Sequence, residues 1–423
     1  MKYLIKKSKL QGEVSISGAK NSALRLLAAS LLTRSKIKLT NFPSSIRDAV
    51  LHLEMLEVLG KDVIKTDEEV IEISEEKQIN TELIWAKRSI RNTLLILGAL
   101  LTRFGEGSVP LPGGCNLGER KYDLHEYIFK KLGAKVWVDS SGKLCATSEG
   151  QRLKGTDIYL PIRSTGATEN GILCGTLAQG KTTIWNPHIR PEILDLIKML
   201  KSMGANIKVY GQERIDIYGV DEIGGAEHEV ILDNLEALTW LVGSVITDGD
   251  VEINNFPYND LEIPLIFLRE SGAQFYRMGE RLIVRGGRPY PVEISTGPYP
   301  GVNSDMQPLF AIYGMCAQGI SKIIDLRFPG RYKYAEELKK MGLEYKIDGN
   351  ILIINGGMKV KGTLVKAGDL RAGAALALAG FVADGETVIE DAWQIDRGYN
   401  NFFQKLKSLN GLIDRVEIEY EHT

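Results

Sequence analysis

One structural pattern occurs six times along the 423-residue sequence, and this repetition restricts the fold more than any other feature. Each copy predicts an apolar helix, a β-rich strand, an amphipathic helix that usually ends at a Leu-Gly or Met-Gly step, and a closing pair of strands. The copies span about 60–70 residues, which is longer than the usual solenoid repeat of about 20–50 residues. The apolar helices are predicted within residues 21–32, 89–102, 166–178, 234–247, 304–317 and 370–383.

The number of copies predicts two similar α/β domains with three copies in each. A single hydrophobic core rarely grows beyond about 250–300 residues, so a chain of this length is expected to divide. The first helix of each copy is apolar nearly all round, which predicts that it is buried inside a ring of sheets. Alternating strands such as 251–253 and 292–294 predict sheets with one buried face. The alternative is an ordinary α/β protein whose copies resemble one another by chance.

The composition excludes several classes of partner. The formal net charge is −2, so no overall basic field attracts nucleic acid or an anionic membrane, and anionic ligands require local arginines. No apolar run approaches the ~18 residues of a membrane span, and residues 1–7 lack the apolar segment of a signal peptide. The four cysteines show neither CxxC pairs nor metal-type spacing. These features predict a cytoplasmic protein with reduced thiols and no metal site.

Short motifs over nearly the whole chain resemble those of the UDP-N-acetylglucosamine enolpyruvyl transferase (MurA) family, and they occur in the family's order. The matching segments are Ile16–Asn21, Leu111–Cys115 with Gly118, Arg120 and Asp123–His125, then Gly166–Asn170, Asp305–Gln307, Asp369–Ala375 and Ile395–Tyr399. The resemblance implies two inside-out α/β barrel domains built from six repeated β/α units, the fold shared with EPSP synthase. It places the cysteine loop in a domain at 20–228 and the anion-binding arginines in a domain at 1–19 and 229–423. The active site is then expected in the cleft between the two domains.

This resemblance implies transfer of the enolpyruvyl group from phosphoenolpyruvate to an acceptor hydroxyl, without a metal or cofactor. The hydroxyl adds to C2 of phosphoenolpyruvate, C3 takes up a proton, and the tetrahedral intermediate loses phosphate. By resemblance, Cys115 is the proton donor, the residue that forms a covalent adduct with substrate, and the target of fosfomycin. Two glycines before Cys115 allow a tight loop, and the nearby Arg120 would lower the thiol pKa. The alternative, a buried structural cysteine, fits Cys174 and Cys316 in apolar helices better.

The resemblance also assigns five cations to phosphoenolpyruvate. Arg331 and Arg371 would bind the carboxylate, and Lys20, Arg120 and Arg397 the phosphate. Guanidinium groups suit this task because they stay charged and bind planar anions in a fork. The alternative is that these are ordinary surface arginines, which is improbable for five cations that fall together on family positions.

A further set of residues is expected to act on the acceptor. Asp305 is the candidate base or hydroxyl-orienting group and would join Cys115, Lys20 and Arg397 as a catalytic residue. Its alternative role is a helix N-cap, because an apolar helix follows it directly. By resemblance, Asn21 and Arg91 would position the acceptor. Asp123, Leu124 and His125 would line the uracil end of the pocket, although a simple packing role fits His125 equally well.

The sequence departs from the family pattern mainly on the acceptor side. The departures are Lys121-Tyr122, Arg163-Ser164-Thr165 before Gly166, Val302-Asn303-Ser304, Arg327–Gly330 and Gln394. Arg163 and Arg327 add positive charge where the family places neutral groups near the diphosphate and the sugar. Arg163, Ser164, Thr165, Gly166 and Arg327 are therefore included among the expected acceptor-binding residues.

Three functions remain open at this point. The first is transfer to the 3′-hydroxyl of UDP-N-acetylglucosamine, which makes a peptidoglycan precursor. The second is transfer to another nucleotide such as UMP in nucleoside-antibiotic synthesis, since an extra arginine suits a terminal phosphate. The third is a catalytically silent nucleotide-binding relative, which the intact catalytic set disfavours. EPSP synthase itself is disfavoured by the cysteine loop. The expected partners are phosphoenolpyruvate and a uridine nucleotide, and the sequence predicts no oligomeric state.

Overall fold

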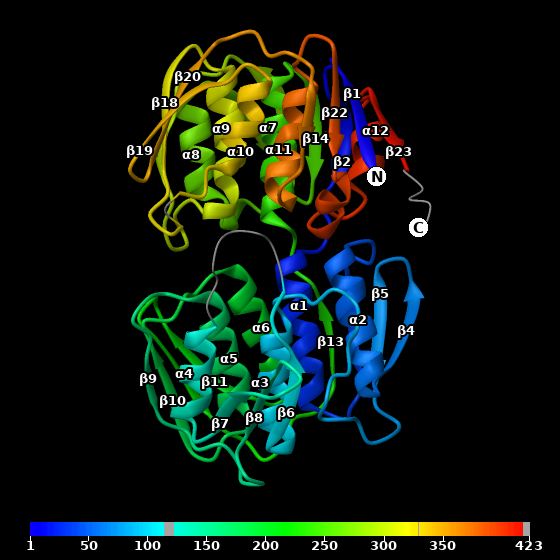
Figure 1. Cartoon of the computed structure of the whole chain (residues 1–423), viewed down its shortest axis with the longest axis vertical. Coiled ribbons are helices and arrows are strands. Elements are labelled where there is room, and N and C mark those ends of the chain that lie inside the picture. Colours follow the sequence, from blue (N-terminus) through cyan, green and yellow to red (C-terminus); the bar gives the residue numbers. More distant parts are fainter. Residues whose placement is uncertain (114–121, 329, 418–423) are drawn as a thin grey trace. The chain divides into compact units, whose positions relative to one another are not determined.

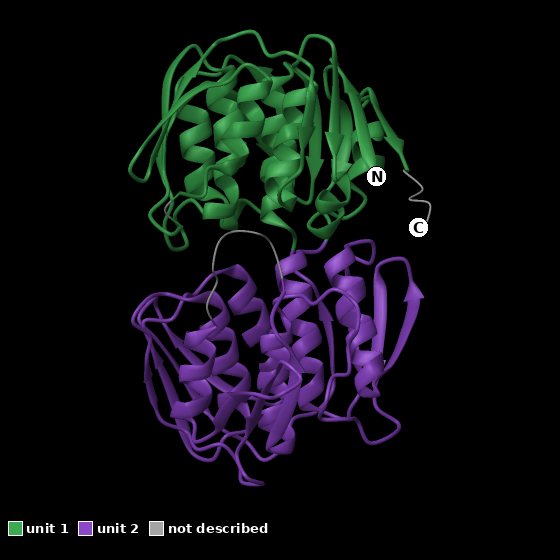
Figure 2. Ribbon diagram, viewed as in Figure 1, with its two compact units in different colours: residues 1–17, 232–423 green, residues 18–231 purple. Residues whose placement is uncertain are grey.

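The computed structural model describes residues 1–113, 122–328 and 330–417, and the chain divides into two compact units (Figure 2). Unit 1 consists of Met1–Ser17 and Leu232–Thr423, and unit 2 of Gly18–Ile231. The chain therefore enters unit 2 after Ser17 and returns to unit 1 after Ile231. Among the described helices, none is both long and apolar enough to cross a membrane.

Unit 2 contains three sheets and six α-helices in its described part (Figure 1). The helices are α1 (Lys20–Ala29), α2 (Arg47–Leu59), α3 (Thr93–Phe104), α4 (Asp123–Lys131), α5 (Thr165–Thr176) and α6 (Pro191–Ser202), and a 3₁₀ turn, η1 (Ser30–Leu32), extends α1. The strands are β3 (Ile37–Thr40), β4 (Asp62–Asp67), β5 (Val70–Ser74), β6 (Glu106–Pro110), β7 (Lys135–Val138), β8 (Lys143–Thr147), β9 (Asp157–Tyr159), β10 (Lys181–Trp185), β11 (Asn206–Tyr210), β12 (Arg214–Tyr218) and β13 (Ala226–Glu229). Their order is β13-β3-β5-β4, β6-β8-β7 and β11-β12-β10-β9.

Unit 1 likewise contains three sheets and six α-helices in its described part. The helices are α7 (Asn234–Ile246), α8 (Glu262–Glu270), α9 (Gln307–Cys316), α10 (Lys333–Lys340), α11 (Leu370–Gly380) and α12 (Phe402–Ser408), with 3₁₀ turns η2 (Tyr258–Asp260), η3 (Ser304–Met306) and η4 (Ala392–Arg397). The strands are β1 (Lys2–Lys6), β2 (Gln11–Ser15), β14 (Asp250–Asn254), β15 (Ala273–Met278), β16 (Arg281–Gly287), β17 (Glu293–Ser295), β18 (Gly319–Ile324), β19 (Glu344–Asp348), β20 (Ile351–Gly356), β21 (Leu364–Lys366), β22 (Glu386–Glu390) and β23 (Ile413–Val416). Their order is β15-β16-β14-β2, β17-β18-β20-β19 and β21-β22-β1-β23.

The repetition in the sequence corresponds to one recurring strand arrangement. In five of the sheets among the described residues, a parallel pair is extended by two antiparallel neighbours, as in β13, β3, β5 and β4. In the sixth sheet, the isolated parallel bridge between Glu82 and Ser108 stands where the others have a parallel strand. Strands from the N-terminus complete two sheets of unit 1, because β2 pairs with β14 and β1 with β22.

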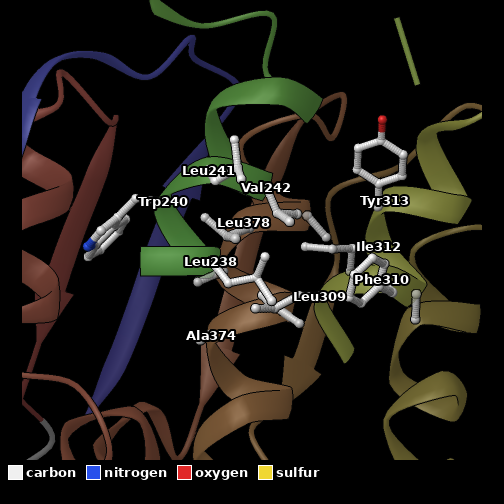
Figure 3. Packing of buried hydrophobic residues seen from close by; sticks show 14 of the residues in the cluster. Leu238, Trp240, Leu241, Val242, Leu309, Phe310, Ile312, Tyr313, Ala374 and Leu378 are labelled. Atoms are coloured by element: carbon white, nitrogen blue, oxygen red, sulfur yellow. The ribbon is translucent and has the colours of Figure 1, made fainter. Parts of the chain in front are cut away.

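The core of unit 1 is built on three helices that are apolar nearly all round. Every residue of α11 is buried, and so are nearly all residues of α7 and α9. Figure 3 shows side chains of the three helices packed together, including Leu238 of α7, Leu309 of α9 and Leu378 of α11. Full burial of one such leucine stabilises the fold by about 1.5–3 kcal/mol. Helices α1, α3 and α5 supply the corresponding core of unit 2.

One buried histidine in unit 2 makes stability depend on pH. His52 in α2 is fully buried, and neither ring nitrogen has a hydrogen-bond partner among the described residues. Burial lowers the pKa of His52 to about 3, whereas an unfolded histidine titrates near pH ~6.5. Between these two pH values, the histidine therefore binds a proton in the unfolded chain but not in the folded protein. His52 therefore does not reduce the free energy of unfolding above about pH 6.5, and it reduces this free energy increasingly as the pH falls below that value.

We expect His52→Leu to reduce the stability lost between pH 7 and pH 5 by about 2 kcal/mol, because leucine removes this proton uptake. Urea unfolding at the two pH values measures the effect. Part of the pH dependence remains, since burial also lowers the pKa of His125 to about 3. An unchanged difference between the two pH values would contradict the assignment to His52.

Candidate active site

Lys20 lies in the first turn of α1 and forms a buried ion pair. Its Nζ is 2.8 Å from Oδ2 of Asp48, and both side chains are less than a tenth exposed. Asp48 belongs to the first turn of α2, where a carboxylate is also favoured by the helix dipole. Sequence reasoning missed Asp48, since an acidic residue in a first helical turn gives no sign of its partner. Each of these two buried groups compensates the charge of the other.

A second buried carboxylate fixes the start of α1. Oδ2 of Asp195 accepts a hydrogen bond from Ser22 Oγ, and Nε2 of His228 lies 2.7 Å from Oδ1. The backbone N–H of Ile231 also donates to Oδ2, at 3.5 Å. The serine contacts the aspartate rather than the histidine, so this trio lacks the serine–histidine contact of a hydrolase triad. Its role is to hold the first turn of α1 and the segment that leaves unit 2.

Beside Asn21, two arginines and two glutamates form a buried network. Arg25 donates to the backbone oxygen of Asn21 and to the carboxylate of Glu169 in α5. Arg190 donates to Glu192 at 2.7 and 2.8 Å. Burial raises the pKa of Glu169. For Glu192, burial acts in the same direction, but Arg190 and Arg25 hold its pKa below the usual value. The network ties together the N-terminal regions of α1, α5 and α6.

The predicted acceptor residues 163–166 lie at the N-terminus of α5. Ser164 is the N-cap and accepts a hydrogen bond from the N–H of Ala167 at 3.4 Å. Thr165 Oγ1 lies 2.8 Å from Nδ1 of His188, and Nε of Arg163 donates to Asn186 at 3.2 Å. The backbone N–H groups at a helix N-terminus favour anions, and Arg163 adds positive charge at this end.

His125 is buried against the start of α5. Its Nδ1 lies 2.7 Å from Nδ2 of Asn170 and accepts the amide hydrogen. Gly166 packs directly on the imidazole, because a Cβ at this position would lie 2.8 Å from two ring atoms. Burial, followed by the charge of Arg91, lowers the pKa of His125 to about 3, so the ring is neutral. These are the contacts of a packed imidazole. In the same turn of α4, Asp123 is exposed and Leu124 half-buried.

The predicted reactive Cys115, the predicted phosphate-binding Arg120 and the divergent Lys121 lie outside the described residues. The segment just before them is held closely, since the N–H of Gly113 donates to Ser89 Oγ at 3.2 Å. A Cβ on Gly113 would lie 2.1 Å from the backbone oxygen of Ser89, which explains the glycine. Burial raises the pKa of both Cys174 and Cys316 to about 12, so these thiols are protonated at neutral pH.

In unit 1, Asp305 pairs with Arg331. Nη1 of Arg331 is 2.7 Å from Oδ1 of Asp305 and 3.1 Å from Oγ of Ser304. The Arg331 side chain is 7% exposed and that of Asp305 is 30% exposed, so the carboxylate stays accessible. Burial opposes the charge of Arg331, but Asp305 and Asp369 raise its pKa above the usual value. The N-cap of η3 is Asn303, which accepts from the backbone N–H of Asp305 at 3.0 Å.

Arg371 is a buried cation in the first turn of α11. It is 2% exposed, and its Nε has no hydrogen-bond partner among the described residues. Nη1 donates to the backbone oxygen of Gly398 at 3.3 Å, and the guanidinium lies 4.9 Å from the ring centre of Tyr399. Burial opposes its charge, but Tyr399 and Asp233 raise the pKa of Arg371. Such a cation is ready to bind an anion.

The two remaining predicted arginines of unit 1 occupy different environments. Arg397 ends η4, is 3% exposed, and donates from Nη1 to Oε1 of Gln394 at 2.9 Å. Arg327 is half-buried in the turn after β18, with its guanidinium 5.6 Å from the ring centre of Phe328. Four of the predicted cations thus lie in unit 1, and Lys20, Arg91 and Arg163 lie in unit 2. Within the described residues, no group of three or more His, Cys, Asp or Glu side chains is arranged to hold a metal ion.

Solved structures define the class of fold. The enolpyruvyl transferase NikO from Streptomyces tendae superposes with a TM-score of 0.88 over 98% of both chains, at 24% identity. EPSP synthase from Acinetobacter baumannii superposes with a TM-score of 0.70 over 98% of this chain and 99% of the other, at 19% identity. The fold is therefore the α/β fold of the enolpyruvyl transferases.

Sequence comparisons show the family. The model of the family EPSP synthase (3-phosphoshikimate 1-carboxyvinyltransferase) matches residues 4–406, and the chain belongs to this family. UDP-N-acetylglucosamine 1-carboxyvinyltransferase 2 of Carboxydothermus hydrogenoformans is 40% identical over 98% of this chain and 99% of its own. UDP-N-acetylglucosamine 1-carboxyvinyltransferase of Actinobacillus succinogenes is 40% identical over 96% of this chain and 97% of its own.

Proposed function

We propose that the protein transfers the enolpyruvyl group of phosphoenolpyruvate to the 3′-hydroxyl of UDP-N-acetylglucosamine, with release of phosphate. The observation that carries this proposal is the buried guanidinium of Arg371, together with the Asp305–Arg331 pair of the same unit, on a chain 40% identical to carboxyvinyltransferases of that specificity. The product is a peptidoglycan precursor, so we place the reaction in the cytoplasm. Phosphoenolpyruvate and a uridine nucleotide are the partners, and the proposed chemistry involves neither nucleic acid nor a membrane.

The proposed reaction is an addition followed by an elimination. Asp305 accepts the proton of the acceptor hydroxyl as its oxygen bonds to C2 of phosphoenolpyruvate, and Cys115 delivers a proton to C3. The tetrahedral intermediate then loses a proton from C3, the double bond re-forms, and the C2–O bond to phosphate breaks. General acid–base catalysis of this kind typically contributes about 10²–10⁴-fold. The accessible carboxylate of Asp305 supports the first step.

Electrostatic stabilisation is assigned to the cations. Arg331 and Arg371 would bind the carboxylate of phosphoenolpyruvate, and Lys20, Arg120 and Arg397 its phosphate. Fixed cations in a water-poor site stabilise developing charge without reorganisation during the reaction. Lys20, Arg371 and Arg397 are all buried, which supports this assignment.

We also propose that each unit is an inside-out α/β barrel, in which the apolar helices lie within a ring of three sheets. The nearly complete burial of α7, α9 and α11 in unit 1, and of α1, α3 and α5 in unit 2, supports this arrangement. The domain with the cysteine loop would extend over about residues 20–228. The domain with the arginines would comprise the rest of the chain.

One observation favours a different acceptor, such as UMP. Arg163 lies immediately before the N-cap of α5, so a guanidinium and a helix N-terminus occur at the same end of unit 2. This combination suits a terminal phosphate, whose charge is concentrated at one end of a nucleoside monophosphate. UDP-N-acetylglucosamine instead places its diphosphate in the middle of the molecule.

A phosphate-release assay tests the proposal. The protein is mixed with phosphoenolpyruvate and, in separate reactions, UDP-N-acetylglucosamine, UMP or shikimate 3-phosphate. Phosphate release with UDP-N-acetylglucosamine as the only active acceptor is the expected result. Phosphate release with UMP only would show that UMP is the acceptor instead. Tight binding of phosphoenolpyruvate without turnover on any acceptor would identify a silent relative.

A further inference from the structure

Asp325 follows β18 directly and is a fully buried carboxylate. Its Oδ1 accepts from Thr296 Oγ1 (2.8 Å) and the backbone N–H groups of Arg327 (2.8 Å) and Phe328 (2.9 Å), and its Oδ2 accepts from Ser304 Oγ (2.6 Å) and Gln307 Nε2. All five donors are neutral, and no ion pair joins Asp325 to a lysine or arginine among the described residues. A buried carboxylate is costly unless hydrogen bonds or a nearby opposite charge compensate it, and Asp325 has five hydrogen bonds and also interacts electrostatically with Arg331.

The hydrogen bond from Ser304 connects Asp325 to the proposed active site. A serine hydroxyl has a single hydrogen, and Ser304 directs it to Oδ2 of Asp325 at 2.6 Å. The oxygen of Ser304 is therefore free to accept from Nη1 of Arg331 at 3.1 Å. The same Nη1 donates to Asp305 at 2.7 Å. A continuous chain of hydrogen bonds thus runs from Asp325 through Ser304 and Arg331 to Asp305.

The other oxygen of Asp325 holds the turn that leads to Arg331. Its hydrogen bonds to the N–H groups of Arg327 and Phe328 fix the backbone three and four residues before that arginine. The position of Arg331 is therefore set from two directions, through its own turn and through Ser304. Both directions start at one carboxylate group.

We propose that Asp325 is a positioning residue that orients Arg331, and through it Asp305, for the enolpyruvyl transfer. The inference rests on the proposed function. An asparagine cannot replace the aspartate, because its amide has one acceptor oxygen and its NH₂ would face donors. If that NH₂ faced Ser304, the hydroxyl hydrogen would lose its acceptor and turn toward the guanidinium of Arg331.

Three variants test this proposal by steady-state kinetics with phosphoenolpyruvate and the active acceptor. Asp325→Asn is expected to lower kcat/KM for phosphoenolpyruvate roughly 10–100-fold, as is usual when a residue that orients a site is lost. Ser304→Ala is expected to lower it in the same way, and it leaves the buried carboxylate in place. The effects of the two substitutions should not multiply in the double variant, because they act through one chain of hydrogen bonds.

Thr296→Val is the matched control. It removes the hydrogen bond that Thr296 donates to the same carboxylate and the one that Thr296 accepts from the N–H of Leu326. The chain of hydrogen bonds through Ser304 stays intact, so Thr296→Val should lower the melting temperature and reduce kcat/KM less than Ser304→Ala does. If Ser304→Ala changes kcat/KM less than twofold, or if the two effects multiply, the positioning role is overturned. Wild-type protein that turns over no acceptor would instead overturn the proposed function, and this inference with it.

Discussion

Replacement of Arg371 by methionine is expected to raise the KM for phosphoenolpyruvate at least about 100-fold. The guanidinium is 2% exposed, and one of its nitrogens has no partner among the described residues, so its hydrogen-bonding capacity is left for a ligand. A hydrogen bond to a charged group contributes about 1.5–3 kcal/mol, and a carboxylate accepts two from an arginine fork. Methionine fills a similar volume without charge. Initial rates at varied phosphoenolpyruvate concentration measure the effect.

The fold of the Arg371→Met variant should survive, because the substitution removes a buried charge and breaks no ion pair among the described residues. Arg269→Met is the control, since this exposed arginine of α8 lies over the ring of Phe275 and has no proposed role in the reaction. We expect its KM to stay at the wild-type value. A natively folded Arg371→Met variant with an unchanged KM would exclude Arg371 from the substrate site.

Replacement of Asp305 by asparagine is expected to lower kcat about 10²–10⁴-fold, because the amide cannot take the proton of the acceptor hydroxyl. The carboxylate is 30% exposed and bonds to Arg331 at 2.7 Å, so it is both accessible and oriented. Binding of phosphoenolpyruvate should persist, and kcat at saturating concentrations of both substrates is the quantity to measure.

The N-cap of η3, which is Asn303, can be tested separately from the carboxylate of Asp305. Asn303 accepts the backbone N–H of Asp305, so Asn303→Ala should lower stability by about 1 kcal/mol and leave the carboxylate in place. We expect its kcat to remain close to the wild-type value. If Asp305→Asn kept a kcat within tenfold of wild type while Asn303→Ala lost activity, the segment would matter for structure rather than for proton transfer.

The sequence predicts the buried helices well and their ends less well. Residues 370–383 read as one apolar helix, but α11 ends at Gly380 and the chain turns before β22. The helix predicted within 89–102 begins only at Thr93. In 304–317, the 3₁₀ turn η3 precedes α9, whose second residue is Pro308, and proline lacks a backbone N–H. An apolar run in the sequence indicates directly that a helix is buried, whereas the residues at which the helix begins and ends also depend on tertiary contacts.

Pairing between distant strands is beyond local sequence patterns. Strand β2 pairs with β14, and β1 with β22, although more than 200 residues separate each pair. The same limit applies to the site. Motifs identify Asp305 and Arg331, but Asp325 shows its role only when the fold brings it to Ser304. An aspartate directly after an apolar strand does indicate a side chain that bonds the backbone of the following turn.

Enolpyruvyl transfer is tested most directly by the chemical identity of the product formed in D₂O. The protein is incubated with phosphoenolpyruvate and UDP-N-acetylglucosamine, and the nucleotide is recovered and analysed by mass spectrometry and NMR. Addition and elimination predict an acceptor that carries an enolpyruvyl ether at the 3′-oxygen, with deuterium in its methylene group. Phosphate release with an unmodified acceptor, or an acceptor that has gained phosphate instead, would contradict enolpyruvyl transfer.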